Sequence, residues 1–320
     1  MRALTIDNGA LEVRERPTPT PQAGDVLVEV HAAGVNAADL LQRRGLYPAP
    51  EGWPSDVPGL ELAGVVCALG PGASTDLLGR RVCAVVGGGA QATHCLVPSE
   101  HLLFVPDGVS WDAAGAFPEA FTTAYDALVS QGHVAPGERV LISGAAGGVG
   151  VASVQIARAY GARVIAVTRT SEHHATLRAL GAHETLTFDG VGGLSGIDLL
   201  VELVGAAHLD LAQRTMAPAG RIVVIGVGSG ARVELDLLRV MTHRLHLTGS
   251  TLRARSRDEK SRVAVDVNRD VVARWATGEL TVPLARVVDL TDATSAYEFF
   301  AQPGKFGKVV LRVSDESPLS

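Results

Sequence analysis

The chain has 320 residues, a length that suggests two domains because one domain usually contains about 150 residues. Hydrophobic residues make up 47% of the sequence and charged residues 19%, a balance that excludes global disorder. The formal net charge of −6 argues against a nucleic acid as the main partner. The three cysteines are too few and too scattered for a disulfide scaffold or a zinc finger, and we expect them to be small buried side chains.

The N-terminal segment has no long apolar stretch followed by a small-residue cleavage site. The sequence also contains no uninterrupted apolar run of about 18 residues. We therefore expect neither a signal peptide nor a transmembrane helix, and we expect a cytoplasmic protein.

The first 110 residues have the pattern of a β-rich, barrel-like unit. Residues 25–31 alternate apolar and polar side chains, which is typical of a half-buried strand. Residues 61–69 and 81–86 predict further strands, and glycine and proline separate them. A helix is predicted between these strands, at about residues 37–44.

Near residue 118 the pattern changes to alternating helices and strands, which is typical of βαβ units in a parallel sheet. The strands expected here are 139–143, 163–167, 197–201 and 221–225. The helices expected here are 119–130, 149–160, 171–180 and 209–216.

After about residue 265 the sequence predicts a long helix, a short valine-rich strand, another helix and a final strand at 308–313. We interpret this tail as a return to the first unit. The predicted organisation is therefore an α/β fold with a nested second domain. Residues 1–118 and 265–320 form one domain, and residues 119–264 form a doubly wound domain inserted into it.

The segment 143–150 reads Ser-Gly-Ala-Ala-Gly-Gly-Val-Gly and lies between a predicted strand and a predicted helix. This is the context of a dinucleotide fingerprint, in which a pyrophosphate rests on backbone N–H groups at a helix N-terminus. Ala145 occupies the first glycine position of the fingerprint, and a tight turn without a ligand is the alternative. The expected cofactor contacts are Gly144, Ala145, Ala146, Gly147, Gly148, Val149 and Gly150.

The end of the second predicted strand indicates which dinucleotide binds. An NAD site usually has an acidic residue there, whereas this chain has Thr168, Arg169 and Thr170. Arg169 can pair with a 2′-phosphate, and His173 follows in the first turn of the next predicted helix. The sequence therefore favours NADPH over NADH. The alternative is that both side chains are ordinary surface residues.

Several segments together resemble the zinc-independent, zeta-crystallin-like quinone oxidoreductases of the medium-chain dehydrogenase/reductase superfamily, and within them the p53-inducible type. The segments that carry the resemblance are the glycine loop and residues 34–48, 58–64, 117–123, 249–258 and 307–311. The resemblance implies a GroES-like catalytic domain and a Rossmann domain, with NADPH in the cleft between them. It also implies a homodimer.

Zinc-dependent members of the superfamily place a cysteine and a histidine where this chain has Asn36 and Leu60. Neither residue is a good zinc ligand, and Glu61 remains without partner ligands. The four closely spaced cysteines of a structural zinc site are missing too. We therefore predict no metal and a conjugated acceptor, because hydride addition to a quinone spreads the new charge over the ring.

The resemblance also implies site residues on the segments that match. Asn36 and Asp39 correspond to positions near the nicotinamide, although both also suit the start of a helix. Tyr47 corresponds to a residue that lines the quinone pocket, and packing against prolines is the alternative. Thr122 corresponds to a nicotinamide contact, and back-bonding inside its helix is the alternative. We predict catalytic roles for Tyr47, Asn36 and Asp39, and cofactor contacts for Asn36 and Thr122.

The remaining cofactor contacts that we expect are Phe188, Gly226 and Lys308. Relatives often have a tyrosine at the adenine ribose where this chain has Phe188, and a lysine where it has His173. We expect His208 to be structural or exposed, and residues 253–257 to be a solvated helix entry, with a cofactor or dimer contact as the alternative.

Together these features predict an NADPH-dependent quinone oxidoreductase in which hydride transfer relies on proximity and orientation. One-electron and two-electron reduction both stay open. One alternative is a 2-alkenal or enone reductase with the same cofactor. Another is a non-catalytic NADPH-binding or RNA-binding protein, although no basic aromatic surface supports RNA binding.

Overall fold

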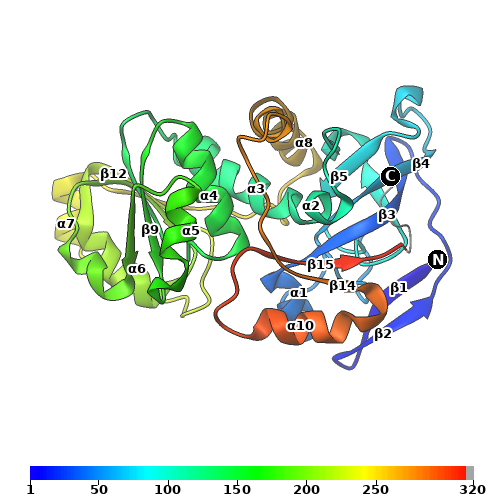
Figure 1. Cartoon of the computed structure of the whole chain (residues 1–320), viewed down its shortest axis with the longest axis horizontal. Helices are drawn as coiled ribbons and strands as arrows, with labels where there is room; N and C mark the ends of the chain where they lie inside the picture. The colour runs from blue at the N-terminus through cyan, green and yellow to red at the C-terminus, as the bar shows by residue number, and fades with distance from the viewer. Residues whose placement is uncertain (315–320) are drawn as a thin grey trace. The chain divides into compact units, whose positions relative to one another are not determined.

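Two sheets organise the computed structural model, which describes residues 1–314 (Figure 1). One sheet has seven strands and is mostly antiparallel, and the other has six parallel strands. Each sheet forms the centre of one compact unit. The first unit comprises Met1–Thr122 and the chain from Arg253 onward, and the second comprises Thr123–Leu252.

The seven-stranded sheet is built around β3 (Asp25–Val35), which pairs with β4, β6 and β15. We expected β3 to be half-buried, but nearly all of it is buried because α2 and α10 also pack against it. The other strands of this unit are β1 (Arg2–Asp7), β2 (Ala10–Glu15), β4 (Glu61–Leu69), β5 (Arg81–Val85), β6 (His94–Pro98), β7 (Leu103–Phe104), β14 (Leu284–Asp289) and β15 (Lys308–Arg312).

The helices of the first unit are four to eleven residues long. The predicted helix at 37–44 is confirmed as α1 (Ala37–Arg43). The predicted long helix begins at Arg257 and continues through a π-helical segment, Asn268–Val272. The other helices are α2 (Trp111–Ala116), α3 (Pro118–Tyr125), α8 (Arg257–Val267), α9 (Ala273–Ala276) and α10 (Ala293–Ala301).

The six-stranded sheet has the spatial order β10-β9-β8-β11-β12-β13. This is the doubly wound 3-2-1-4-5-6 order of a dinucleotide-binding fold, in which the strand order reverses between the first and fourth strands. The strands are β8 (Arg139–Ile142), β9 (Arg163–Thr168), β10 (Glu184–Thr187), β11 (Ile197–Glu202), β12 (Met216–Val224) and β13 (His246–Gly249). The helices are α4 (Gly148–Ala159), α5 (His174–Ala179), α6 (Ala206–Ala212) and α7 (Leu237–His243).

The four strands predicted for this sheet are present, so the parallel α/β arrangement is confirmed. The predicted list missed β10 and β13, which have only four residues each. The helix expected at 171–180 begins as a 3-10 turn, Ser171–His173, before α5. None of the helices in residues 1–314 is long and apolar enough to cross a membrane.

The first unit resumes before α8, whereas we expected the return at about residue 265. Ion pairs at the start of α8 account for this earlier return to the first unit. Arg257, the first residue of α8, forms ion pairs with Glu100 and Asp25. Its backbone carbonyl also lies 3.0 Å from Nε2 of His101. These contacts join the start of α8 to the first unit.

Candidate active site and cofactor site

The glycine loop joins β8 to α4 at the carboxyl edge of the six-stranded sheet. Gly144 has a φ of 59°, in the left-handed region that favours glycine. A Cβ on Gly150 would lie 2.4 Å from the carbonyl oxygen of Gly144, so only glycine allows this close approach. A Cβ on Gly147 would meet only that same oxygen, at 3.5 Å, which leaves the loop open beside it. The open loop fits a pyrophosphate at the N-terminus of a twelve-residue helix.

The departure from the glycine fingerprint at Ala145 has a structural explanation. The Ala145 side chain is completely buried, and its backbone N–H donates to the carbonyl of Val167 at 2.9 Å. A methyl group therefore fits at the first glycine position without covering the loop. Ala146 precedes the helix, and Gly148 and Val149 form its first turn. Backbone N–H groups in a first helical turn have no partner inside the helix and are available to an anion.

Arg169 follows the end of β9 and is exposed. Within residues 1–314 its side chain forms no ion pair or hydrogen bond, so its guanidinium is available to a ligand. The neighbouring Thr168 hydroxyl contacts the Thr170 carbonyl at 2.7 Å and Nε2 of His174 at 2.9 Å. His173 is half-buried in the 3-10 turn. The turn after β9 therefore carries an available cation and no acidic residue between Thr168 and Ser171.

Phe188 and Gly226 lie after two other strands of the same sheet. Phe188 follows β10, its side chain is 37% exposed, and its ring centroid lies 5.7 Å from that of His208. Gly226 follows β12, and a Cβ there would lie 2.3 Å from the carbonyl oxygen of Leu203. Gly226 therefore has a packing reason to be glycine, whether or not it also contacts a cofactor.

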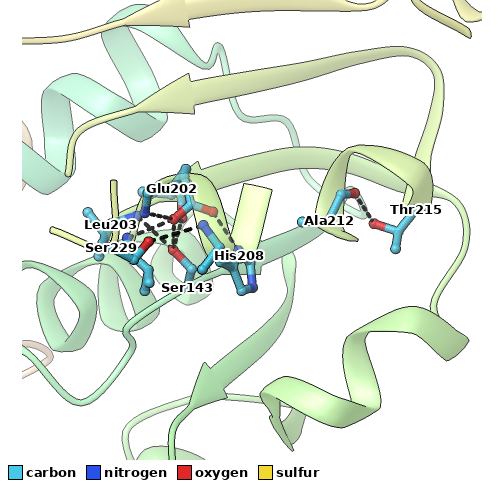
Figure 2. Close-up of polar contacts among 11 residues, drawn as sticks. Ser143, Glu202, Leu203, His208, Ala212, Thr215 and Ser229 are labelled. Carbon is cyan, nitrogen blue, oxygen red and sulfur yellow. Dashed lines mark hydrogen bonds and ion pairs between the residues drawn. The ribbon is translucent and has the colours of Figure 1, made fainter. Parts of the chain in front are cut away.

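A buried polar network also lies at this edge, and the sequence did not predict it (Figure 2). Glu202, the last residue of β11, accepts hydrogen bonds from the Ser143 hydroxyl at 2.9 Å and from Nδ1 of His208 at 2.5 Å. It also accepts from the backbone N–H groups of Val204 and Gly205. His208 is thus buried and paired, not exposed. The available signal was a glutamate that directly follows the apolar residues 199–201 at the end of β11.

In the first unit, Asn36, Glu61 and Lys308 form one buried cluster. The Lys308 ammonium lies 2.5 Å from Oδ1 of Asn36 and 2.5 Å from Oε1 of Glu61. The Asn36 amide donates to Glu61 at 2.9 Å, and the backbone N–H of Glu119 donates to the other carboxylate oxygen at 2.8 Å. Burial alone lowers the pKa of Lys308, but the nearby carboxylates, above all Glu61, raise it overall. The lysine is therefore held as a cation.

Two members of this cluster, Asn36 and Glu61, lie at positions that the comparison with zinc-dependent enzymes considered as zinc ligands. Asn36 and Glu61 share the Lys308 ammonium, so the carboxylate already has a cationic partner. Across residues 1–314, no group of three or more His, Cys, Asp or Glu side chains could hold a metal ion. The metal-free reaction stays a prediction for metal analysis to test.

Asp39 lies in the first turn of α1 and is fully buried. Its carboxylate accepts hydrogen bonds from the backbone N–H of Asn36 at 2.8 Å and of Gly59 at 3.1 Å. Burial raises the pKa of this carboxyl to about 7, because these hydrogen bonds only partly offset the loss of hydration. The helix-start interpretation of Asp39 therefore fits its contacts, and its predicted catalytic role stays a prediction.

The raised pKa of Asp39 predicts a pH-dependent stability. The folded carboxyl keeps its proton up to about pH 7, whereas the unfolded one loses it near its ordinary value of 3.8. Folding therefore binds a proton in this range, and stability falls as pH rises, by up to about 1.4 kcal/mol per pH unit. Urea unfolding at pH 4.5 and 7.5 should show Asp39→Asn gaining stability relative to the parent at the higher pH. The exposed Asp76→Asn is the control, and an equal pH response of parent and Asp39→Asn would contradict the prediction.

Tyr47 is held by an arginine whose role the sequence did not reveal. The Arg253 guanidinium lies 4.5 Å from the centre of the Tyr47 ring and donates to the Tyr47 carbonyl at 3.1 Å. It also donates to Oε1 of Gln42 and to the carbonyl of Gly87. The expectation of a solvated segment was therefore wrong for Arg253, which is buried because it ties together α1, the loop that carries Tyr47 and the loop after β5.

Thr122 carries a polar atom that protein contacts leave unsatisfied. The residue is buried in α3, and its hydroxyl has no hydrogen-bond partner within residues 1–314. A buried hydroxyl without a partner costs free energy, so a ligand group that pairs with it gains affinity. The back-bonding expected as the alternative is therefore absent for Thr122.

Comparison with known proteins agrees with this architecture. Residues 22–132 match the family model of the alcohol dehydrogenase GroES-like domain, and residues 148–267 match that of the zinc-binding dehydrogenases. The quinone oxidoreductase of Sus scrofa is 31% identical over 304 residues, which cover 92% of this chain and 90% of that protein.

Solved structures with the same fold cover nearly the whole chain. The quinone oxidoreductase of Thermus thermophilus, also solved in complex with NADPH, superposes with a TM-score of 0.85 and 34% identity over 98% of this chain and 100% of that one. An NAD-dependent alcohol dehydrogenase superposes with a TM-score of 0.84 and 28% identity over the same shares of the two chains. The chain therefore belongs to the quinone oxidoreductases of the medium-chain dehydrogenase/reductase superfamily, a family of oxidoreductases with a GroES-like domain and a Rossmann domain.

Proposed function

We propose that this oxidoreductase uses NADPH to reduce quinones and needs no metal. The observation that carries the proposal is the glycine loop, open at Gly147, together with the available guanidinium of Arg169 after the next strand of the sheet. A loop that lets a ligand come close to the backbone favours a dinucleotide. An arginine in place of the usual acidic residue favours a cofactor with a 2′-phosphate. The relative from Thermus thermophilus, solved with NADPH, supports the same cofactor.

Bound NADPH would supply the hydride. The chain's own residues then bind and orient the reactants. The Thr122 hydroxyl has no partner in the described part of the chain and is suited to a hydrogen bond with the nicotinamide carboxamide. The Tyr47 phenol, on a loop that Arg253 fixes, is suited to donate a hydrogen bond to the acceptor oxygen. A quinone spreads the charge that it receives, so the reaction does not require a Lewis acid.

Replacing Arg169 with alanine should weaken NADPH binding far more than NADH binding, because only NADPH has the 2′-phosphate. Loss of a charge-assisted hydrogen bond of about 1.5–3 kcal/mol corresponds to a KM for NADPH that is roughly 10- to 100-fold higher. Steady-state kinetics with both cofactors would measure this. Arg178→Ala, which changes an exposed arginine of α5, is the matched control. Equal effects of Arg169→Ala on both cofactors would remove Arg169 from the phosphate site.

A panel of acceptors under one NADPH oxidation assay tests the proposed function. Turnover with naphthoquinones and little turnover with 2-alkenals is the expected result. Preferred reduction of 2-alkenals or enones would favour the reductase alternative. Tight NADPH binding without turnover of any acceptor would favour a binding protein. Zinc that is stoichiometric in the active protein, and lost together with activity on chelation, would overturn the metal-free reaction.

We further propose that two copies of the chain associate through α7 and β13. β13 is the edge strand of its sheet, so one side of its backbone is open to another strand. Large apolar side chains are exposed on these two elements, namely Leu237, Leu238, Met241 and Leu247. A self-complementary edge with exposed apolar side chains is suited to a two-fold symmetric dimer.

Leu238→Glu should convert the dimer to a monomer, because it places a charge within the proposed apolar interface. Leu238 is 65% exposed in the single chain, so its replacement should leave the fold of the unit intact. Sedimentation velocity measures the change in mass. Leu78→Glu is the control, because Leu78 is 57% exposed and lies on neither element. A parent chain that sediments as a monomer, or a Leu238→Glu variant that stays dimeric, would contradict this interface.

A further inference from the structure

Within residues 1–314, one ring nitrogen of His208 has no hydrogen-bond partner. The residue is only 2% exposed, and Nδ1 donates to Oε2 of Glu202 at 2.5 Å. Nε2 is buried and has no hydrogen-bond partner within residues 1–314. Leaving a buried polar nitrogen unpaired is unfavourable, so such an atom in a well-connected network indicates a missing partner.

The imidazole is held firmly by its surroundings. Glu202 is completely buried, and besides His208 it binds the Ser143 hydroxyl and the backbone N–H groups of Val204 and Gly205 (Figure 2). The Ser143 hydroxyl in turn accepts a hydrogen bond from the backbone N–H of Leu203 at 2.6 Å. The network thus connects the residue before the glycine loop to the turn between β11 and α6. A ring whose Nδ1–H points to a carboxylate presents Nε2 in one fixed direction.

The position of the network in the fold indicates the ligand. Ser143 follows β8 and Glu202 ends β11, and these neighbouring strands are the pair between which the strand order reverses. In open α/β sheets, ligands bind outside the carboxyl ends of the strands at this place. The partly exposed ring of Phe188 lies 5.7 Å from the imidazole of His208, tilted by 53°. A flat apolar ring beside a hydrogen-bonding nitrogen is suited to a nucleoside, which has an aromatic base and several polar donors.

We propose that Nε2 of His208 forms a hydrogen bond with the adenosine part of the bound dinucleotide, and that Glu202 is the positioning residue for this contact. The inference rests on the proposed function only in taking a dinucleotide as the cofactor. In the tautomer whose Nδ1–H donates to Glu202, Nε2 accepts a hydrogen bond. The adenine amino group and the ribose hydroxyls are the donors that an adenosine offers.

Two substitutions distinguish the roles of the two ring nitrogens of His208. In His208→Asn the amide nitrogen can take the place of Nδ1 and keep the contact with Glu202, but nothing replaces Nε2. In His208→Gln the amide can take the place of Nε2. Thr185→Val is the matched control, because Thr185 lies on β10 of the same sheet and its hydroxyl is also buried without a partner within residues 1–314. The three variants therefore compare loss of Nε2, its replacement, and loss of an unrelated unpaired atom.

Isothermal titration calorimetry with 2′,5′-ADP and with 5′-AMP tests the proposal. We expect His208→Asn to weaken binding of both probes by about 3- to 10-fold, whereas His208→Gln and Thr185→Val stay within about twofold of the parent. Unchanged affinity of His208→Asn for both probes, or a parent that binds neither probe, would overturn the proposal.

A measurement on the unsubstituted protein covers the case in which His208→Asn does not fold. Nitrogen NMR of the histidine rings should show the Nε2 resonance of His208, assigned by its absence in His208→Gln, shifting when 5′-AMP is added. No shift at saturating 5′-AMP would overturn the proposal. Neither probe contains nicotinamide and neither experiment contains a quinone. Histidine-dependent binding of 5′-AMP by a chain that reduces no quinone would therefore refute the proposed function and leave this inference standing.

Discussion

Lys308→Met should lower the free energy of unfolding by about 3–5 kcal/mol, because it leaves the Glu61 carboxylate buried without a cation. Glu61 and Lys308 are both almost completely inaccessible to solvent. The remaining donors to Glu61, the Asn36 amide and the Glu119 backbone N–H, are neutral and do not replace the ammonium. Urea unfolding at pH 7.5 would measure the loss.

The double variant Lys308→Met with Glu61→Gln is the informative control. It removes both charges, so it should recover a large part of the stability that the single variant loses. Lys305→Met is the matched single variant, because Lys305 is only partly buried and stacks on Phe300, and it should change stability by at most about 1 kcal/mol. A double variant no more stable than Lys308→Met alone would show that the ion pair is not the origin of the loss.

Gly150→Ala should both destabilise the second unit and impair cofactor binding. The new Cβ would lie 2.4 Å from the Gly144 carbonyl oxygen and 2.6 Å from the Cα of Ala145, so the backbone of the loop must move. Overpacking of this kind costs about 1–3 kcal/mol. We expect the dissociation constant for NADPH, measured by fluorescence titration, to rise at least about tenfold, since the moved loop no longer presents its N–H groups correctly.

Two other glycines separate the packing effect from a general effect of alanine. Gly193→Ala should be neutral for both stability and binding, because a Cβ there meets no atom within 4 Å. Gly147→Ala should leave the stability of the cofactor-free protein nearly unchanged, since its Cβ has ordinary contact at 3.5 Å, yet weaken NADPH binding. A Gly150→Ala variant with the parent's stability and affinity would contradict the close approach of loop and helix.

Local sequence signals predicted the features that depend on neighbouring residues. The glycine loop, α1 and four strands of the parallel sheet follow from hydrophobic periodicity and from glycine between a strand and a helix. β10 and β13 were missed because four mixed residues, Glu-Thr-Leu-Thr and His-Leu-Thr-Gly, do not produce a strand pattern. Their strand conformation comes from pairing with β9 and β12.

The polar clusters could not be predicted, because their members are far apart in the chain. Lys308 and Asn36 are separated by 272 positions, and Ser143 and Glu202 by 59. Arg253 looked like one member of a charged surface segment, yet it is buried because it binds loops that lie more than 160 positions before it. Only the folded chain determines which charged residues find partners in the interior.

We propose that this chain transfers hydride from NADPH to a quinone without a metal. The most direct measurement is the stoichiometry of NADPH oxidation and quinone reduction by purified protein whose zinc content has been reduced to trace contamination. Sustained turnover that does not increase when zinc is added is the result we expect. No turnover until zinc is restored, with activity proportional to bound zinc, would contradict the account.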